Sequence, residues 1–235
     1  MIRNSLTTLV ALAVLVAGST VSRADVILDD FSNPHPAAQF LIGSQNANPY
    51  TITTDLGGGT IRTATFGVTS PHLPGPFSLL GVVGGGSLDL FLDSTSSGYA
   101  VIKYALGTPL DLRGIGGSSG AIRLTSQSAA TVGNPDVPFT LSLFTPTGTL
   151  TETGSFVNSA GFVDQDIAFS GFSGSGDISH VTGVSLGVTG HTADDFRLDK
   201  IALTQPQQVP APPAAFLLLA ALPALCLRSY FGRKA

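Results

Sequence analysis

The chain has 235 residues, with 11 lysines and arginines against 15 aspartates and glutamates, and a formal net charge of −4. This acidic balance argues against a nucleic-acid partner, because binding to phosphates needs a basic surface. The single cysteine, Cys226, excludes an internal disulfide and a cysteine-based zinc site.

Residues 1–24 have the three parts of a secretory signal peptide. Arg3 supplies the positive region, Leu6–Val16 is the apolar stretch, and Ser22-Arg23-Ala24 places small residues at −3 and −1. We therefore expect signal peptidase to cut between Ala24 and Asp25, so that the residues that follow are exported.

Residues 25–204 consist of short β-like segments separated by turn residues, and no window of about ten residues has a helical period. The predicted strands are Val26–Phe31, Tyr50–Thr54, Thr60–Val68, Ser87–Leu92, Tyr99–Leu106, Ala121–Ser126, Phe139–Thr145, Thr149–Phe156, Gln165–Ser170, Val181–Val188 and Phe196–Thr204. Many short strands with frequent turns predict an all-β fold, an antiparallel jelly-roll-like β-sandwich.

Glycine-rich segments punctuate this domain. Gly57-Gly58-Gly59 and Pro146-Thr147-Gly148 each join two predicted strands, which is typical of hairpins. Leu80–Gly86 and Gly114–Gly120 lack the Gly-Lys-Ser/Thr ending of a phosphate-binding loop, and we interpret both as tight turns.

The last predicted strand changes its alternation partway along. Phe196 and Leu198 share one parity, whereas Ile201 and Leu203 have the other. One extra residue at Asp199 or Lys200 would restore a common face, which predicts a β-bulge there. This segment, together with Val26–Phe31, resembles the last and first strands of jelly-roll carbohydrate-binding-like domains. The resemblance implies that the two terminal strands are neighbours.

Adjacent terminal strands would bring Asp29, Asp30 and Asp199 together. Calcium binds six to eight oxygen ligands, so these carboxylates predict a structural calcium site outside the cell. The alternative is that they cap turns and face water.

No motif in residues 25–208 predicts catalysis. No carboxylate pair, histidine spacing or Gly-x-Ser-x-Gly elbow indicates an active site. Sugar binding commonly uses aromatic rings, but the chain has no tryptophan, and Tyr50, Tyr99 and Tyr104 are the tyrosines of this part. We expect a protein that is not an enzyme and needs no cofactor besides the predicted calcium.

The C-terminal part has the order of a membrane anchor. Residues 205–208 are a polar linker, and residues 214–231 are predicted as one hydrophobic transmembrane helix, with its densest apolar run at Ala214–Leu227. Positive residues after a span favour the cytoplasmic side, so the preceding residues should lie outside. A buried C-terminal helix of a globular domain is the alternative interpretation.

Residues 209–235 resemble the PEP-CTERM sorting signal of Gram-negative bacteria. The matching residues are Val209, Pro210 and Pro212, followed by Arg228, Arg233 and Lys234, while Ala211 stands where that family has glutamate. The resemblance implies processing by an exosortase-like protease, a transient stay in the inner membrane, and delivery to the cell surface or extracellular matrix.

The exported part, residues 25–208, contains six basic and 15 acidic residues, so its net charge is −9. We predict a structural or adhesive protein in a biofilm or exopolysaccharide setting, in contact with extracellular polysaccharide. A carbohydrate-binding module and an envelope hydrolase are the two alternatives.

Overall fold

The computed structural model describes residues 25–32, 38–42, 49–69, 79–94, 96–116, 120–129 and 136–204. The predicted signal peptide, the linker, the sorting motif Val209–Pro212 and the helix at 214–231 lie outside these residues. Within the described part of the chain, no helix is long and apolar enough to cross a membrane.

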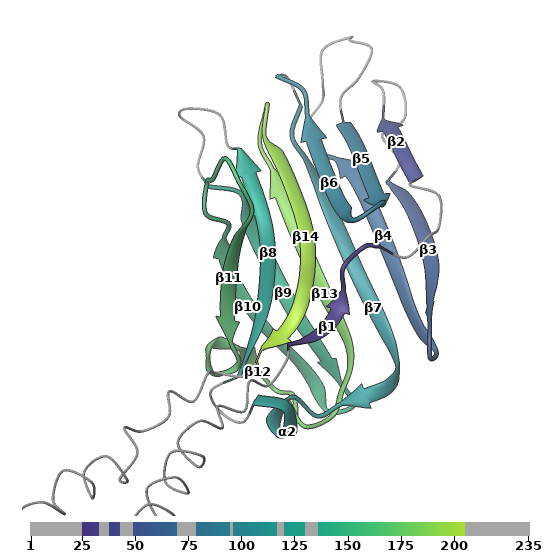
Figure 1. Cartoon of the computed structure of the whole chain (residues 1–235), viewed down its shortest axis with the longest axis vertical. Helices are drawn as coiled ribbons and strands as arrows, with labels where there is room; N and C mark the ends of the chain where they lie inside the picture. Colours follow the sequence, from purple (N-terminus) through teal and green to yellow (C-terminus); the bar gives the residue numbers. More distant parts are fainter. Residues whose placement is uncertain are drawn as a thin grey trace, which may run out of the picture. The chain divides into compact units, whose positions relative to one another are not determined.

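The described strands form two seven-stranded sheets, and all their pairings are antiparallel (Figure 1). Sheet A has the order β11 (Val163–Ala168), β8 (Ala121–Ala129), β14 (Asp195–Thr204), β6 (Ser87–Leu92), β5 (Leu79–Gly84) and β2 (Ala38–Ile42), and β1 (Val26–Asp29) also pairs with β14. Sheet B has the order β12 (Ser173–Gly174), β10 (Gly148–Ser155), β9 (Pro138–Thr145), β13 (Val181–Gly190), β7 (Gly98–Leu110), β4 (Thr60–Val68) and β3 (Tyr50–Gly57).

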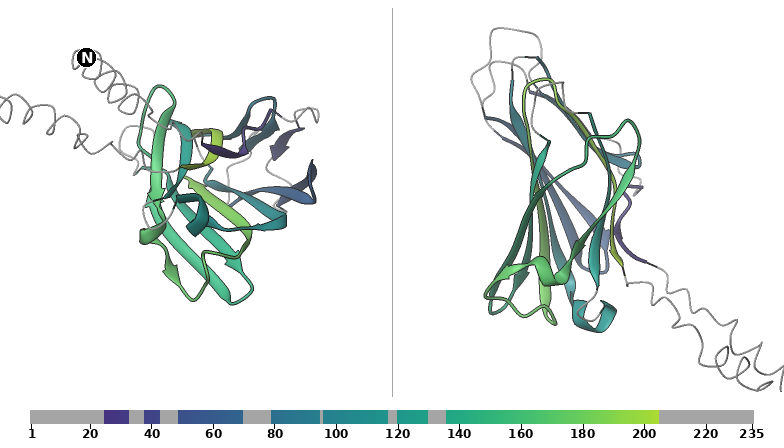
Figure 2. Two further views of the ribbon diagram at one scale, coloured as in Figure 1. Left: turned by 60° about the horizontal axis from the view of Figure 1, so that its bottom comes forward. Right: turned by 90° about the vertical axis from the view of Figure 1, so that its left-hand side faces the viewer.

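The two sheets face each other as layers (Figure 2), which confirms the predicted antiparallel β-sandwich. Consecutive strands repeatedly cross between the sheets, as in jelly rolls. The described helices are short: α2 (Leu112–Gly116) and the 3-10 turn η2 (Phe169–Gly171).

Both predicted hairpins are present. β3 pairs with β4 through a turn whose glycines, Gly57 to Gly59, all have positive φ, and β9 pairs with β10 around Thr145 and Gly148. Positive φ costs glycine little, because it has no Cβ.

The interpretation of Leu80–Gly86 as a tight turn was wrong for most of its length. Residues 79–84 form β5, which pairs with β6, and only Gly84 to Gly86 have the positive φ of a turn. Strand Leu79–Gly84 was missed because its sequence, Leu-Leu-Gly-Val-Val-Gly, carries no period-two alternation. β2 and β12 were also not predicted.

The bulge in the last strand is confirmed. Leu198 pairs with Ser126 but Lys200 pairs with Thr125, so Asp199 is the extra residue. Phe196, Leu198, Ile201 and Leu203 are consequently all buried. β1 pairs with β14, as the resemblance of the terminal strands implies.

The core lies between the sheets, and among the described residues its buried apolar members run from Phe31 to Leu203. β6 contributes Leu88, Leu90 and Leu92. Three phenylalanine rings contact one another at tilted angles, with ring centroids 4.9 Å apart for Phe139 and Phe156 and 4.5 Å for Phe156 and Phe196. Asp25–Pro206 forms a compact unit, and this part of the chain therefore holds a core of its own.

Candidate functional site

The outer side of sheet B carries a continuous row of hydroxyl side chains. The register places one residue from every strand in line, and all but one of them carry a hydroxyl: Thr53, Thr63, Lys103, Ser185, Ser142, Thr151 and Ser173. Their neighbours along the strands, such as Ala64, Tyr104 and Leu141, are buried, so the row faces away from the core.

A second row lies beside the first on the same side. It runs through Thr51, Thr65, Val101, Gly187, Thr140 and Thr153. Cross-strand hydroxyl contacts join Thr51 to Thr65 at 3.0 Å and Ser142 to Thr151 at 3.5 Å. We call the two rows together the hydroxyl face. Its one charged residue is Lys103.

The hydroxyl face is hollowed above Gly187, in the central strand β13. A depression of about 250 Å³ lies here, with Tyr99 and Val101 on one side and Thr140 on the other. A Cβ at Gly187 would have its nearest neighbour, the Thr140 carbonyl oxygen, at 3.8 Å. The missing side chain therefore creates the hollow.

Tyr99 supplies an aromatic ring at this hollow. The ring occupies the space above Gly67 of β4, where an added Cβ would lie 2.5 Å from the ring. Gly67 therefore lets the ring lie close to the sheet, and Tyr99 is half-buried in that position. An aromatic ring, hydroxyls and a shallow hollow form a surface that can hydrogen-bond and stack without charge.

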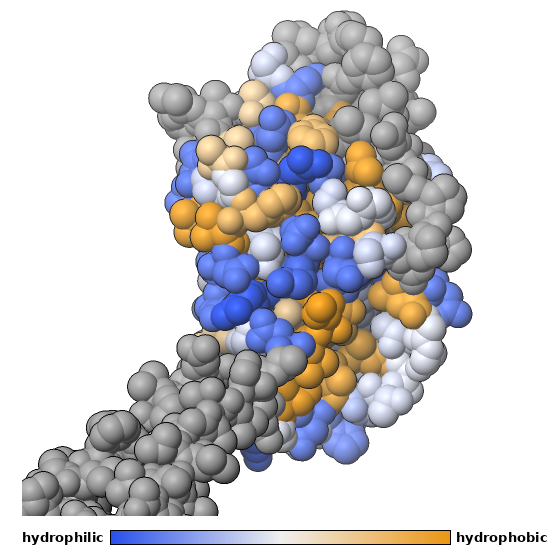
Figure 3. All heavy atoms as spheres, in the orientation of Figure 1, coloured by the Kyte–Doolittle hydropathy of each residue, from blue (hydrophilic) through white to orange (hydrophobic). Residues whose placement is uncertain are grey.

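The outer side of sheet A is chemically different. Arg123 of β8 contacts Asp166 at 2.8 Å, Asp25 at 3.3 Å and Asp164 at 3.7 Å, and the hydrogen-bonded carboxylate of Asp166 raises the pKa of Arg123. Arg197 of β14 binds both oxygens of Asp89 at 3.2 Å. Figure 3 shows hydrophilic residues over this side. These charges are paired with one another.

Asp29, one of the three predicted calcium ligands, is buried and points between the sheets. Its Oδ2 accepts hydrogen bonds from Arg62 of β4 and Tyr104 of β7, each at 2.8 Å, and its Oδ1 accepts one from the Phe31 amide at 2.8 Å. The Arg62 guanidinium also lies 5.5 Å from the centre of the Phe31 ring. Burial, followed by the charge of Asp29, raises the pKa of Tyr104, which therefore stays protonated and donates.

The other two predicted ligands have different surroundings, because Asp30 follows the end of β1 and Asp199 lies within β14. Asp30 is exposed and accepts hydrogen bonds from the Ser32 amide and hydroxyl, which lower its pKa. Asp199 is the bulged residue of β14, whereas Asp29 pairs with Ile201.

Arg62 places a positive charge 2.8 Å from the Asp29 carboxylate. Among the described residues, no group of three or more His, Cys, Asp or Glu is arranged to hold a metal. Calcium binding stays a prediction, which calorimetry on residues 25–208 would test.

The hydroxyl face was not identified from the sequence. The predicted strands do contain alternating threonines, as in Thr149, Thr151 and Thr153. That alternation was the available signal, but strand order was needed to bring the threonines into rows.

No protein-family model and no curated protein matches the chain. Similar solved structures include PfGH50B, at 11% identity and TM-score 0.39, covering 60% of this chain and 22% of that one. An exo-beta-agarase is similar at 12% identity and TM-score 0.38, covering 70% of this chain and 24% of that one. The family 11 carbohydrate-binding module of a cellulosomal cellulase from Clostridium thermocellum is similar at 13% identity and TM-score 0.34, with 73% and 96% covered.

This chain thus spans less than a quarter of the length of PfGH50B and of the exo-beta-agarase.

Proposed function

We propose that this protein is exported, held in the inner membrane by residues 214–231, and processed near Val209–Pro212 by an exosortase-like protease. Outside the cell it works as a non-catalytic adhesive module in a polysaccharide matrix. The hydroxyl face of sheet B makes the polysaccharide contact.

The observation that carries the binding proposal is the chemistry of the hydroxyl face. Serine and threonine hydroxyls both donate and accept hydrogen bonds, which matches the hydroxyl groups of a sugar. Tyr99 adds a ring that can stack on the apolar side of a sugar, at the edge of the Gly187 hollow. Rows that cross the whole sheet suit an extended chain better than a single small molecule.

Charge selects the class of polysaccharide. The hydroxyl face has Lys103 as its one charged residue, and the exported part has a net charge of −9. An anionic polymer would therefore be repelled, and it would meet one cation on the face. We propose a neutral polysaccharide.

The binding test uses Gly187→Leu, which fills the hollow. The position has an ordinary φ and room for a Cβ, so the sheet should tolerate the change. Residues 25–208 should be retarded in gels containing neutral polysaccharides such as dextran or agarose, and Gly187→Leu should abolish the retardation.

Gly161→Leu is the matched control, because Gly161 has room for a side chain, with nothing within 4 Å of an added Cβ, and lies outside the hydroxyl face. Equal retardation of both variants, or retardation by anionic alginate alone, would contradict the proposal.

The sorting proposal has its own test. Mass spectrometry of the mature protein from a host with exosortase should show that the residues after the sorting motif have been removed. Mature protein that still contains Lys234 and Ala235 would exclude processing of this kind.

A further inference from the structure

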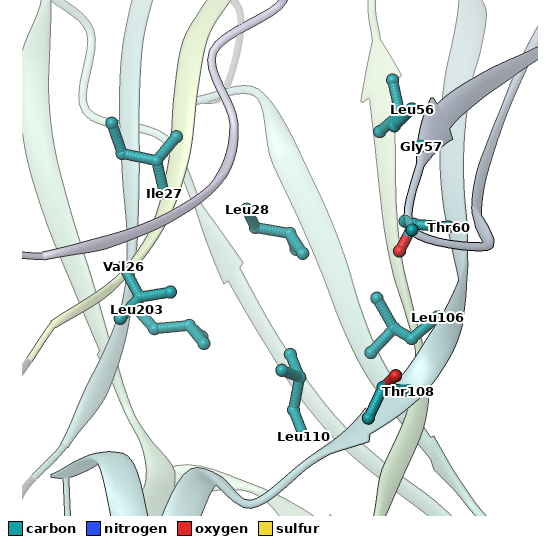
Figure 4. Close-up of a pocket in the computed structure, with 11 residues that line it drawn as sticks. Val26, Ile27, Leu28, Leu56, Gly57, Thr60, Leu106, Thr108, Leu110 and Leu203 are labelled. Carbon is teal, nitrogen blue, oxygen red and sulfur yellow. The ribbon is translucent and has the colours of Figure 1, made fainter.

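An apolar groove lies at the end of the sandwich where β1 begins and β14 ends. It has a volume of about 300 Å³ and lies between the two sheets. Val26, Leu28 and Leu203 line it from sheet A, and Leu56, Leu106 and Leu110 line it from sheet B (Figure 4). We call this pocket the exit groove.

The groove exists because sheet A is narrower than sheet B at this end. β6 pairs with Asp195–Leu198 of β14, and beyond the bulge the short β1 takes its place against Ile201–Leu203. In sheet B, β7 continues through Leu110. The leucines at the far end of β7 therefore face one short strand.

The rim of the groove exposes large apolar side chains to solvent. Val26 is 46% exposed and Ile27 is 54% exposed. Figure 3 shows an apolar patch at this end, below the hydrophilic part of sheet A. An exposed apolar patch on an otherwise acidic domain is typical of a surface that contacts something else.

The position of the groove indicates what that contact is. Val26 and Leu203 are direct partners across β1 and β14, so the chain enters and leaves the domain beside the groove. The predicted membrane span begins about ten residues after Thr204, and extended chain covers at most about 3.5 Å per residue. The tether therefore limits the groove to within roughly 35 Å of the bilayer core.

We infer that the exit groove rests on the surface of the lipid bilayer while the protein is anchored, with Val26, Ile27 and the lining leucines in the interfacial region. This inference depends on the anchor in the proposed function. The net charge of −9 opposes attraction to anionic headgroups, so apolar side chains make the contact. The contact should consequently persist at high salt.

The experiment uses the absence of tryptophan from the chain. The exported chain with its anchor, residues 25–235, carries Ile27→Trp and is reconstituted into vesicles of phosphatidylethanolamine and phosphatidylglycerol, with or without brominated acyl chains. Bromine quenches a nearby indole, so Trp fluorescence at position 27 should be largely lost in brominated vesicles and shifted to the blue in unbrominated ones. Val26→Trp serves as a second reporter, should Ile27→Trp fold poorly.

The matched control is Tyr50→Trp. Tyr50 is 49% exposed, close to the 54% of Ile27. It lies at the opposite end of β3 from Gly57, about 23 Å away along the strand. Its fluorescence should be equal in both kinds of vesicle.

Each outcome has a distinct meaning. Quenching at position 27 and not at position 50 supports the inference. Equal quenching at both positions, or at neither in a chain that floats with the vesicles, overturns the groove contact and leaves the anchor standing. A chain that does not float with the vesicles overturns the anchor and the groove contact together.

Discussion

The outer faces of the two sheets are built from the same pleated geometry but present opposite chemistry. On sheet A, Arg123 and Arg197 bind carboxylates of neighbouring strands, so the charges satisfy one another. On sheet B, the rows through Ser142 and Thr140 present hydroxyls with one charge among them. A surface with internally paired charges gains little from a new partner, whereas a hydroxyl surface can exchange water for sugar hydroxyls.

The largest loss of stability should come from replacing Arg62, which points from sheet B into the space between the sheets. Arg62→Met leaves the buried carboxylate of Asp29 without its cation, which should lower the free energy of unfolding by about 3–5 kcal/mol. Urea denaturation of residues 25–208 measures this.

Arg123→Met is the control for this change. Its ion pairs are partly exposed, so the loss should be about 1 kcal/mol or less. If Arg62→Met and Arg123→Met lose similar free energy of unfolding, the buried pair of Arg62 and Asp29 contributes no more than the partly exposed pairs of Arg123.

Breaking the ion pair between Arg197 and Asp89 on sheet A should lower stability by an intermediate amount and leave polysaccharide binding unchanged. Arg197→Gln removes the partner of Asp89, whose side chain is only 7% exposed, and should cost about 1–3 kcal/mol. Denaturation and gel retardation on the same variant separate the two quantities. Weaker retardation of this variant by polysaccharide would indicate that sheet A takes part in binding, which would contradict the proposal.

Removing the Tyr99 ring from the hydroxyl face should weaken polysaccharide binding. Tyr99→Ala should weaken binding to neutral polysaccharide about tenfold, which corresponds to about 1.4 kcal/mol. Tyr50→Ala, at the edge strand, is the matched control and should bind as the unchanged chain does. Retardation gels over a range of polysaccharide concentrations give both affinities.

The smallest loss of polysaccharide affinity should come from removing a single hydroxyl group, that of Thr65. Thr65→Val keeps the β-branched shape and removes the group that contacts Thr51 at 3.0 Å, so affinity should fall roughly twofold to tenfold. Stability should change by less than about 0.5 kcal/mol. Thr125→Val on sheet A, whose hydroxyl binds Asp164 at 2.7 Å, should leave affinity unchanged.

Much of the sandwich could be predicted because strand signals are local. Alternation placed Leu88, Leu90 and Leu92 on one side, and the change of parity around Asp199 located the bulge. The contacts of Asp29 could not be predicted from the sequence. β1 has an irregularity between Ile27 and Asp29, and Asp29 accepts a hydrogen bond from Arg62 of the other sheet, 33 residues further along the chain.

The sequence by itself determined most of the strand segments, though not β2, β5 and β12, together with the hairpins and the bulge, because each of these follows from a few neighbouring residues. It also carries the signal-like ends that predict export and anchoring. The tertiary structure decided which strands are neighbours, and so brought Thr53, Lys103, Ser142 and Ser173 into one row. Such rows depend on pairings between residues far apart in the chain, which no local pattern specifies.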